Sequence, residues 1–259
     1  MTDLSIAYID ADILVYRAVA YVDDEFDGSP VALPRNGLAV FKELLERWLS
    51  EIRQHVKLKD YFLCITVGKN FRHFIYKDYK ANRKATGQHP ALNGLKLLVR
   101  DLEATICEQH IEADDLIALR CTEGQGRFAV SADKDFLTVP CVTYYPKSHG
   151  KTEGTWVRTS LADADRQMFL QSMTGDTIDN YKGIEKCGPV KAAKFLEAAV
   201  SESDLWRKTL AAFQRNGYTE DYALVMVRLA RILRHGEYDF QTQKITLWKP
   251  PIQEGKAND

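Results

Sequence analysis

The chain has 259 residues, 45% of them hydrophobic, and a formal net charge of −1. This length allows one large domain or two smaller ones with a substantial core, and the near-neutral charge does not by itself predict a nucleic-acid partner. No apolar run approaches the roughly 18 residues that cross a membrane, and five scattered cysteines without a C-x-x-C pair favour reduced thiols in a cytoplasm and argue against zinc.

Strands and helices alternate through the first 160 residues. Apolar periodicity predicts strands at 4–10, 61–67 and 127–136, with shorter edge strands at 142–146 and 155–159. The same criterion predicts amphipathic helices at 40–56 and 91–106, and the run "IEADDLIALR" begins another. The alternation predicts an α/β fold with a mostly parallel sheet covered by helices on both faces.

From about residue 163 the pattern becomes helical. Four helices are predicted, at 163–175, 188–200, 204–217 and 220–235, followed by a strand-like tail at 244–251. The change in pattern predicts a domain boundary between residues 162 and 163.

Carboxylates gather at predicted strand ends and helix starts. Asp10 ends the first strand, and Asp133 and Asp135 follow a later one. In open parallel sheets, ligands bind outside the carboxyl ends of the strands. Further acids open a helix or lie in the helical half: Glu112, Asp114, Asp115, Asp176 and Asp179.

Each acid group also has an ordinary explanation, because acids favour the first turn of a helix and are common in turns. Together, however, they would repel one another unless cations lie between them. Oxygen ligands without His or Cys select Mg²⁺ or Mn²⁺. Two such ions, roughly 4 Å apart, could activate water and stabilise the leaving oxygen of a phosphodiester.

Residues 69–84 carry six basic side chains against one acid, Asp78. Helical spacing would place Tyr76, Tyr79, Lys80 and Arg83 on one face, which suits phosphate contacts and base stacking. The alternative is a solvated helix that buries its aromatic rings.

A glycine hairpin precedes the predicted helix at 188–200. Gly183 and Gly188 lie five apart, and Pro189 follows at a helix start. Exposed amides there could hold a phosphate, with Lys191 and Lys194 adding charge. A structural helix–turn–helix without a ligand would look much the same.

Five stretches in order, "YIDADIL", "YKANR", "IEADDLIA", "SADKDF" and "GDTIDNYKGIEKCG", resemble the flap endonuclease, or 5′-nuclease, superfamily. The tail at 229–250 is most similar to the 5′→3′ exonucleases of short-tailed phages. The resemblance implies a PIN-like core at 1–162, a short helical gateway at about 71–110, and a helix–three-turn–helix region within 163–259 that grips duplex DNA.

The same resemblance implies two divalent cations and assigns roles to residues. The implied metal ligands are Asp10, Glu112, Asp114, Asp115, Asp133, Asp135, Asp176 and Asp179. Lys80 and Arg83 would hold the scissile phosphate, and Tyr79 would stack on a terminal base. The other implied substrate contacts are Tyr76, Lys84, Gly183, Lys186, Gly188 and Lys191. The Gly183–Gly188 hairpin would hold the uncut strand and is a candidate K⁺ site.

The sequence departs from the family pattern twice. Val67 stands where the family has an acid, and Asp12 is a candidate substitute; Lys186 stands where the hairpin has a glycine. Only 28 residues separate Arg83 from Glu112, which leaves little chain for a tall arch and favours duplex ends or gaps over long flaps.

We therefore expect a metal-dependent 5′→3′ exonuclease of double-stranded DNA, acting in the cytoplasm of a bacterial or phage-infected cell. Flap cleavage and primer removal from RNA–DNA hybrids are further activities implied by the family. The alternatives are a PIN-type ribonuclease and a structure-specific DNA-binding protein that has lost catalysis.

Overall fold

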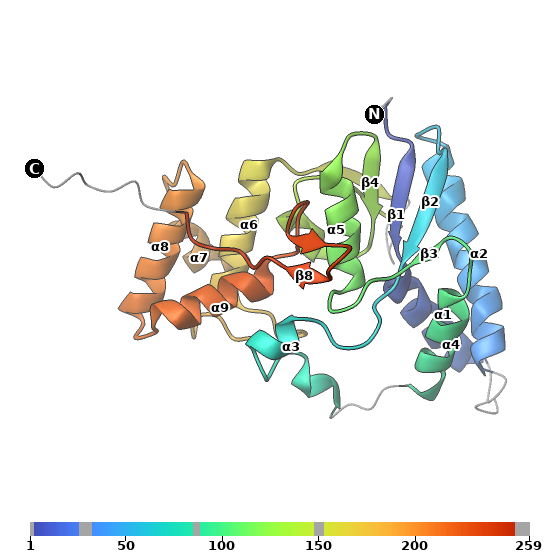
Figure 1. Cartoon of the computed structure of the whole chain (residues 1–259), viewed down its shortest axis with the longest axis horizontal. Helices are drawn as coiled ribbons and strands as arrows, with labels where there is room; N and C mark the ends of the chain where they lie inside the picture. The colour runs from blue at the N-terminus through green and yellow to red at the C-terminus, as the bar shows by residue number, and fades with distance from the viewer. Residues whose placement is uncertain (1–2, 26–32, 85–88, 148–152, 252–259) are drawn as a thin grey trace, which may run out of the picture.

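A six-stranded sheet lies at the centre of the first half of the chain (Figure 1). The computed structural model describes residues 3–25, 33–84, 89–147 and 153–251. The strands are β1 (Ile6–Asp10), β2 (Asp60–Cys64), β3 (Thr105–Ile106), β4 (Arg127–Val130), β5 (Val142–Tyr145) and β6 (Thr155–Arg158). Their order is β3-β2-β1-β4-β5-β6, and only β6 is antiparallel to its neighbour.

Helices cover both faces of this sheet. The helices α1 (Ala11–Glu25), α2 (Leu33–Arg53) and α4 (Pro90–Arg100) pack on one face, with Ile9 in their core. The helix α5 (Ala113–Glu123) packs on the other face, where the preceding residue of β1, Tyr8, points. The predicted mostly parallel sheet with two covered faces is confirmed.

The second half of the chain is mainly helical and has its own core. Its helices are α6 (Leu161–Thr174), α7 (Pro189–Phe195), α8 (Glu202–Arg215) and α9 (Glu220–Ala230). Buried side chains such as Phe169, Phe213 and Met226 form this core. The predicted boundary at 162–163 falls in the first turn of α6 and stays a prediction.

After α9 the chain returns across α5 (Figure 1). It forms a small ribbon from β7 (Tyr238–Asp239) and β8 (Lys244–Ile245), and Phe240 beside it packs on the guanidinium of Arg120 in α5. Leu233 and Tyr238 join the core on the α5 face of the sheet. The C-terminal segment therefore packs against the half that contains the six-stranded sheet as well as against the helical half.

Several predicted elements end earlier than their apolar pattern. The predicted helix 91–106 ends at Arg100, and Thr105–Ile106 instead pairs with β2 as an edge strand. The predicted helix 220–235 ends at Ala230, because Arg231 adopts an extended backbone. The predicted strand 127–136 ends at Val130, and the predicted helix 188–200 ends at Phe195.

The segment 71–84 is not one helix. It contains α3 (Arg72–Ile75) and the short 3-10 helix η1 (Ala81–Lys84). Tyr76 between them is extended, and Lys80 has φ +53°, so the helical face predicted for Tyr76, Tyr79, Lys80 and Arg83 is wrong.

Within the described parts of the chain, every helix is too short or too polar to span a membrane.

Candidate metal centre

Asp10 lies at the carboxyl end of β1 and is only 6% exposed. Its carboxylate accepts hydrogen bonds from the Ser131 hydroxyl at 2.9 Å and from the Ile13 amide at 3.2 Å. Burial, reinforced by the neighbouring Asp12 carboxylate, raises the pKa of Asp10 to about 7. The folded chain therefore holds this carboxylate where its charge is poorly compensated.

Asp133 and Asp135 lie at the start of the 3-10 helix η2 (Lys134–Thr138), and the Asp133 charge acts on Asp10. Ser131 connects the two groups, because its hydroxyl accepts from the Asp133 amide at 3.1 Å and donates to Asp10. Loss of hydration, followed by repulsion from the Asp133 carboxylate, raises the pKa of Asp135 to about 7. The Asp133 residue is exposed, but partial loss of hydration at its carboxylate raises its pKa as well. Repulsion from the Asp179 and Asp176 carboxylates adds to this shift.

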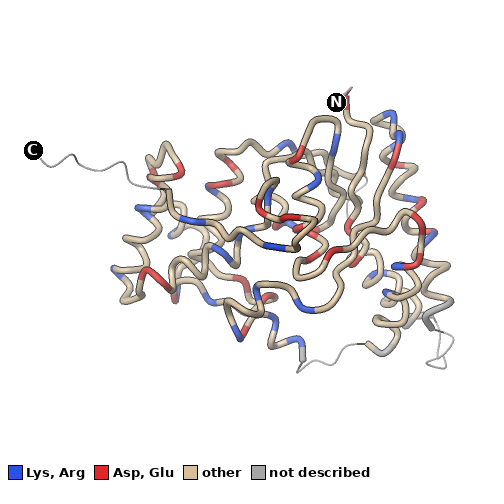
Figure 2. The backbone as a smooth tube through the Cα atoms, in the orientation of Figure 1, with Lys and Arg blue, Asp and Glu red and all other residues tan. Residues whose placement is uncertain are grey.

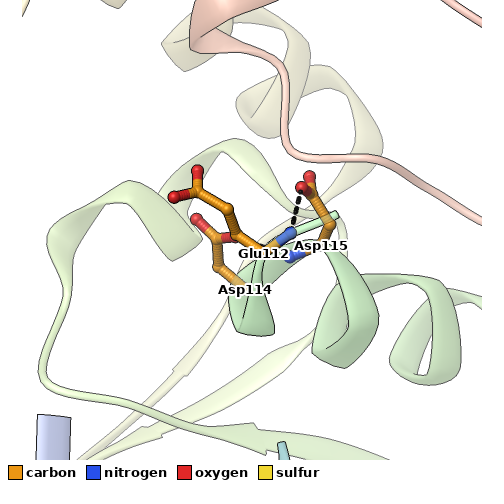
Figure 3. Close-up of side chains that lie close together, drawn as sticks. All are labelled: Glu112, Asp114 and Asp115. Atoms are coloured by element: carbon orange, nitrogen blue, oxygen red, sulfur yellow. Dashed lines mark hydrogen bonds between the residues drawn. The ribbon is translucent and has the colours of Figure 1, made fainter. Parts of the chain in front are cut away.

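Three further acids lie at the start of α5, with carboxylate oxygens within 4.8 Å of one another. Glu112 and Asp114 point to one side of the helix end, whereas Asp115 points away and accepts the Glu112 amide at 3.1 Å (Figure 3). Burial, then repulsion from Asp115 and Glu112, raises the pKa of Asp114 well above its ordinary value. Glu112 and Asp114 therefore lie together on the side of the helix end away from the Asp115 carboxylate.

Asp115 is fully engaged with protein donors. Both of its oxygens accept from the Arg72 guanidinium, at 2.6 and 2.8 Å, and the amides of Glu112 and Leu233 complete the set at 3.1 and 3.0 Å. A carboxylate has about four lone-pair positions. All are used by described residues, so this geometry does not support the predicted role of Asp115 as a metal ligand.

Asp176 and Asp179 are presented by a tight loop after α6. Gly175 and Gly183 have φ +71° and +58°, and a Cβ on Gly183 would lie 2.4 Å from the Met173 carbonyl oxygen. Only glycine allows the two backbone strands to cross this closely. Asp176 then stabilises the loop by accepting the amides of Ile178 and Asp179, at 2.7 and 3.1 Å.

Cations from the basic segment reach this acidic group. Lys80 Nζ lies 2.5 Å from Glu112 Oε1 and 3.5 Å from Asp179 Oδ2, and Arg83 lies 3.0 Å from Asp179. Burial alone would raise the pKa of Glu112, but Lys80 and Arg72 lower it to about 2. Lys and Arg recur along the α3–η1 stretch of the backbone (Figure 2).

Backbone contacts fasten the basic segment to the acidic loop. The Lys80 amide donates to the Asp179 carbonyl at 2.9 Å, and the Asn82 side chain donates to the Thr177 carbonyl at 2.9 Å. The Asn180 side chain donates to the Asp78 carbonyl at 2.7 Å. Two segments about 100 residues apart thus form one rim. Asn82 and Asn180 were not predicted as site residues, although both lie inside the motifs "YKANR" and "GDTIDNYKGIEKCG".

Tyr79 hydrogen-bonds to two of the predicted metal ligands, a role that differs from the predicted stacking on a base. Its ring is 2% exposed, and its hydroxyl lies 2.7 Å from Glu112 and 2.9 Å from Asp179. The ring offers no face to a base in this structure, so the geometry does not favour the predicted stacking role. Tyr76 packs partly buried against the helical core, and the Lys84 side chain lies outside the described residues.

Asp12 occupies the space beside the end of β2. It accepts the Thr66 amide at 3.2 Å and pairs with Lys96 of α4 at 2.6 Å, while Val67 packs against the core. Lys96 gave no signal in the sequence, because a lone lysine on a helix is usually solvated. The carboxylate of Asp12 is thus close to the place where Val67 lacks one.

The glycine hairpin keeps the backbone conformation of a glycine-rich turn. Lys186 has φ +56°, a left-handed value that favours glycine, and its side chain is exposed. The Gly183 carbonyl accepts from the Tyr222 hydroxyl at 3.3 Å, and Gly188 is the N-cap of α7. Lys191 on α7 is exposed as well.

Comparison with known proteins connects this arrangement to nucleases. The profile of a family described as 5′-3′ exonuclease, N-terminal resolvase-like domain, matches residues 5–158. The exonuclease of Escherichia phage T7 is 26% identical over 291 aligned residues, which cover 96% of this chain and 94% of that protein. The exodeoxyribonuclease of Enterobacteria phage T3 is 25% identical, with the same coverage.

Other relatives cover less sequence or only the fold. DNA polymerase I of Rhizobium leguminosarum is 33% identical over 140 residues, but these span half of this chain and only 14% of the polymerase. The phage T5 5′-exonuclease with bound zinc has a TM-score of 0.60 at 17% identity, covering 87% of this chain and 89% of that one. A phage T5 flap endonuclease complex with DNA and metal ions has a TM-score of 0.51 at 15% identity, covering 87% and 97%.

Proposed function

Because the chain belongs to the family of 5′-3′ exonucleases with an N-terminal resolvase-like domain, we propose that it hydrolyses double-stranded DNA from 5′ ends in the presence of divalent cations. The observation that carries this proposal is the crowding of carboxylates at one edge of the sheet, with Lys80 and Arg83 on the rim. Coverage of 94% of the T7 and T3 exonucleases supports an enzyme of their type.

The carboxylates fit a divalent cation site on their chemistry. Burial or loss of hydration raises the pKa values of Asp10, Asp114, Asp133 and Asp135, and at each of them a neighbouring carboxylate adds to the shift. Such a group of oxygen ligands suits Mg²⁺ or Mn²⁺. The T5 relative has itself been crystallised with metal ions in two structures. When bound, two such ions supply water activation and charge neutralisation at the leaving oxygen.

We assign the ligand role to seven of the eight predicted acids. They are Asp10, Glu112, Asp114, Asp133, Asp135, Asp176 and Asp179. Asp10, Asp133 and Asp135 come from the strand ends, Glu112 and Asp114 from the start of α5, and the other two from the glycine-bounded loop. Asp115 is left out, because its lone pairs serve Arg72 and two amides.

Lys80 and Arg83 would hold the non-bridging oxygens of the scissile phosphate. Both now pair with carboxylates, so they can turn to a phosphate only when the charge on Glu112 and Asp179 is neutralised otherwise. Fixed cations aimed at an oxygen where charge develops are among the largest contributions to catalysis. Loading the acidic group would thus release the phosphate-binding side chains.

The helical half would bind the duplex at a distance from the scissile phosphate. In our proposal, the Gly183–Gly188 hairpin contacts the backbone of the uncut strand as part of a helix–three-turn–helix region, with Lys186 and Lys191 near phosphates. A K⁺ ion at the hairpin carbonyls is a further part of the proposal, weakened by Lys186 in place of a glycine. Tyr76 and Lys84 are proposed to contact the substrate strand.

The short connection between η1 and α4 favours duplex ends and gaps. Only residues 85–89 join Lys84 to Pro90. A connection of this length provides little chain to encircle a single strand. We therefore propose that recessed or blunt 5′ ends are cleaved faster than long 5′ flaps, with RNA–DNA hybrids as further substrates.

The test is a cleavage panel with one strand labelled at its 3′ end. Blunt, recessed, gapped and long-flap DNA duplexes, an RNA–DNA hybrid and single-stranded RNA are each incubated with Mg²⁺, Mn²⁺ or EDTA. We expect stepwise shortening of duplex DNA from its 5′ end with either metal and none with EDTA. Preferential cleavage of single-stranded RNA would instead support a PIN-type ribonuclease.

The variant Asp133→Asn is expected to abolish cleavage while retaining binding to duplex DNA. Asp101→Asn makes the same change at an exposed carboxylate beyond the end of α4 and serves as the matched control. Binding of duplex DNA by the wild-type chain without any cleavage under all metal conditions would show a catalytically inactive DNA-binding protein and overturn the proposal.

A further inference from the structure

Arg72 is a buried arginine whose side chain is only 2% exposed. It uses every N–H group of its guanidinium. Nη1 donates to Asp115 at 2.6 Å and to Glu112 at 3.3 Å, and Nη2 donates to Asp115 at 2.8 Å. The remaining donors reach two main-chain carbonyls, Leu229 at 3.3 Å and Arg231 at 2.7 Å. An arginine offers five such donors, so none is left for a phosphate.

Arg72 and its partners come from three separate parts of the chain. Arg72 itself begins α3, just ahead of the basic segment, while Glu112 and Asp115 form the start of α5. Leu229 and Arg231 lie where α9 ends and the C-terminal segment begins. One fork of hydrogen bonds thus joins the basic segment, the acidic helix end and the C-terminal segment.

The C-terminal segment also contacts the Asp115 carboxylate directly. The Leu233 amide donates to Asp115 at 3.0 Å, which requires the chain to leave the helical path after Ala230. Further along, Arg234 donates to the Thr138 carbonyl at 2.9 Å, at the end of the 3-10 helix that carries Asp135. Because α9 ends early, the C-terminal segment contacts both α5, through Asp115, and η2, the element that carries Asp135.

We propose that Arg72 and Asp115 are positioning residues, which fix Glu112 toward the acidic group and couple its orientation to docking of the C-terminal segment. Neither residue contacts metal or DNA. That the site binds metal rests on the proposed function. The positioning role is inferred from the hydrogen bonds of Arg72 and Asp115, which use all donors of the one and all acceptor positions of the other. Asp115 holds the Glu112 amide, and Arg72 holds the Glu112 carboxylate.

A Lys at position 72 keeps the charge but cannot form the fork. We expect Arg72→Lys to lower Mn²⁺ affinity at least tenfold in isothermal titration, with kcat reduced and KM for duplex DNA little changed. Arg166→Lys is the matched control, because Arg166 also donates to two carbonyls, at 3.0 and 2.8 Å, but within the helical half. It is expected to keep the Mn²⁺ affinity. Wild-type Mn²⁺ affinity in a folded Arg72→Lys protein would overturn the proposal.

A measurement on the unmodified protein separates positioning from ligation, and it stays informative if Arg72→Lys does not fold. The amides of Glu112 and Leu233 both donate to Asp115. If Asp115 only positions, amide hydrogen exchange at both residues stays equally slow or slows further when Mg²⁺ is added. If Asp115 turns to bind the metal, both amides lose protection, and the proposal is wrong. The readout does not depend on DNA cleavage, so an inactive protein that binds Mg²⁺ still decides it.

Discussion

Replacing Asp10 by Asn tests whether the carboxylates are crowded at the expense of stability. The pKa of Asp10 rises from 3.8 to about 7, chiefly through burial. Because the folded pKa lies above the unfolded one, the folded state binds the extra proton between these values. The contribution of Asp10 to stability in the absence of metal is therefore fully present below about pH 4 and is lost as the pH rises through 7.

The size of the effect follows from the same values. Each pKa unit corresponds to about 1.4 kcal/mol, so ionising Asp10 costs the folded chain on the order of 4 kcal/mol. Asparagine removes this cost but accepts less well from Ser131 and Ile13, which loses about 1–2 kcal/mol. In EDTA at pH 8, Asp10→Asn is expected to be more stable than the wild type by about 2–3 kcal/mol.

Urea unfolding followed by circular dichroism suits this test, because urea leaves the electrostatic repulsion unscreened. The advantage of Asp10→Asn should shrink as the pH is lowered to 4, and it should shrink at pH 8 when Mg²⁺ stabilises the wild type. Asp60→Asn, at the exposed start of β2 on the opposite edge of the sheet, is the control. An Asp10→Asn protein that is less stable than the wild type at pH 8 in EDTA would refute the reasoning.

Three further predictions follow from the same site. Lys80→Ala is expected to lower kcat at saturating DNA by about 10²-fold, since it removes one fixed cation; unchanged single-turnover rates would contradict its phosphate role. Gly183→Ala should destabilise the fold by about 1–3 kcal/mol in thermal unfolding, whereas Gly188→Ala, with open space around its Cβ and φ −78°, should not. Mg²⁺ affinity should rise between pH 5 and 8, because Asp10 and Asp135 have pKa values of about 7; a flat titration series would contradict this.

The strand-end acids were predictable because their position follows from topology. Asp10 and Asp133 come after short apolar strands, and the carboxyl ends of parallel strands meet at one edge of the sheet. The alternation of helices and strands likewise predicted the sheet and its two covered faces. These inferences need only local patterns and a general rule of parallel sheets.

The partners of those acids were not predictable from local patterns. Arg72 lies in a run of basic residues and looks solvated, yet it is buried among partners up to 159 residues away. The helical periodicity of 220–235 is genuine, but Leu233 must leave the helix to reach Asp115. Lys80 likewise takes φ +53°, which brings its amide to the Asp179 carbonyl. In each case a tertiary hydrogen bond overrides the local preference.

The tertiary hydrogen bonds of Arg72, Leu233 and Lys80 also counteract the repulsion between the carboxylates. Without metal, the repulsion of Asp10 by Asp133 and of Asp135 by Asp176 would push the strand ends and the 176–180 loop apart. At the start of α5, Glu112 and Asp115 repel Asp114 in the same way. The elements stay together because each is also fastened by contacts that do not depend on metal. Arg72 and Leu233 hold α5, Arg234 holds η2, and Lys80 and Asn82 hold the loop. Such neutral and cationic contacts keep the oxygens in place before any cation arrives, and that preorganisation limits the structural rearrangement that cation binding must drive.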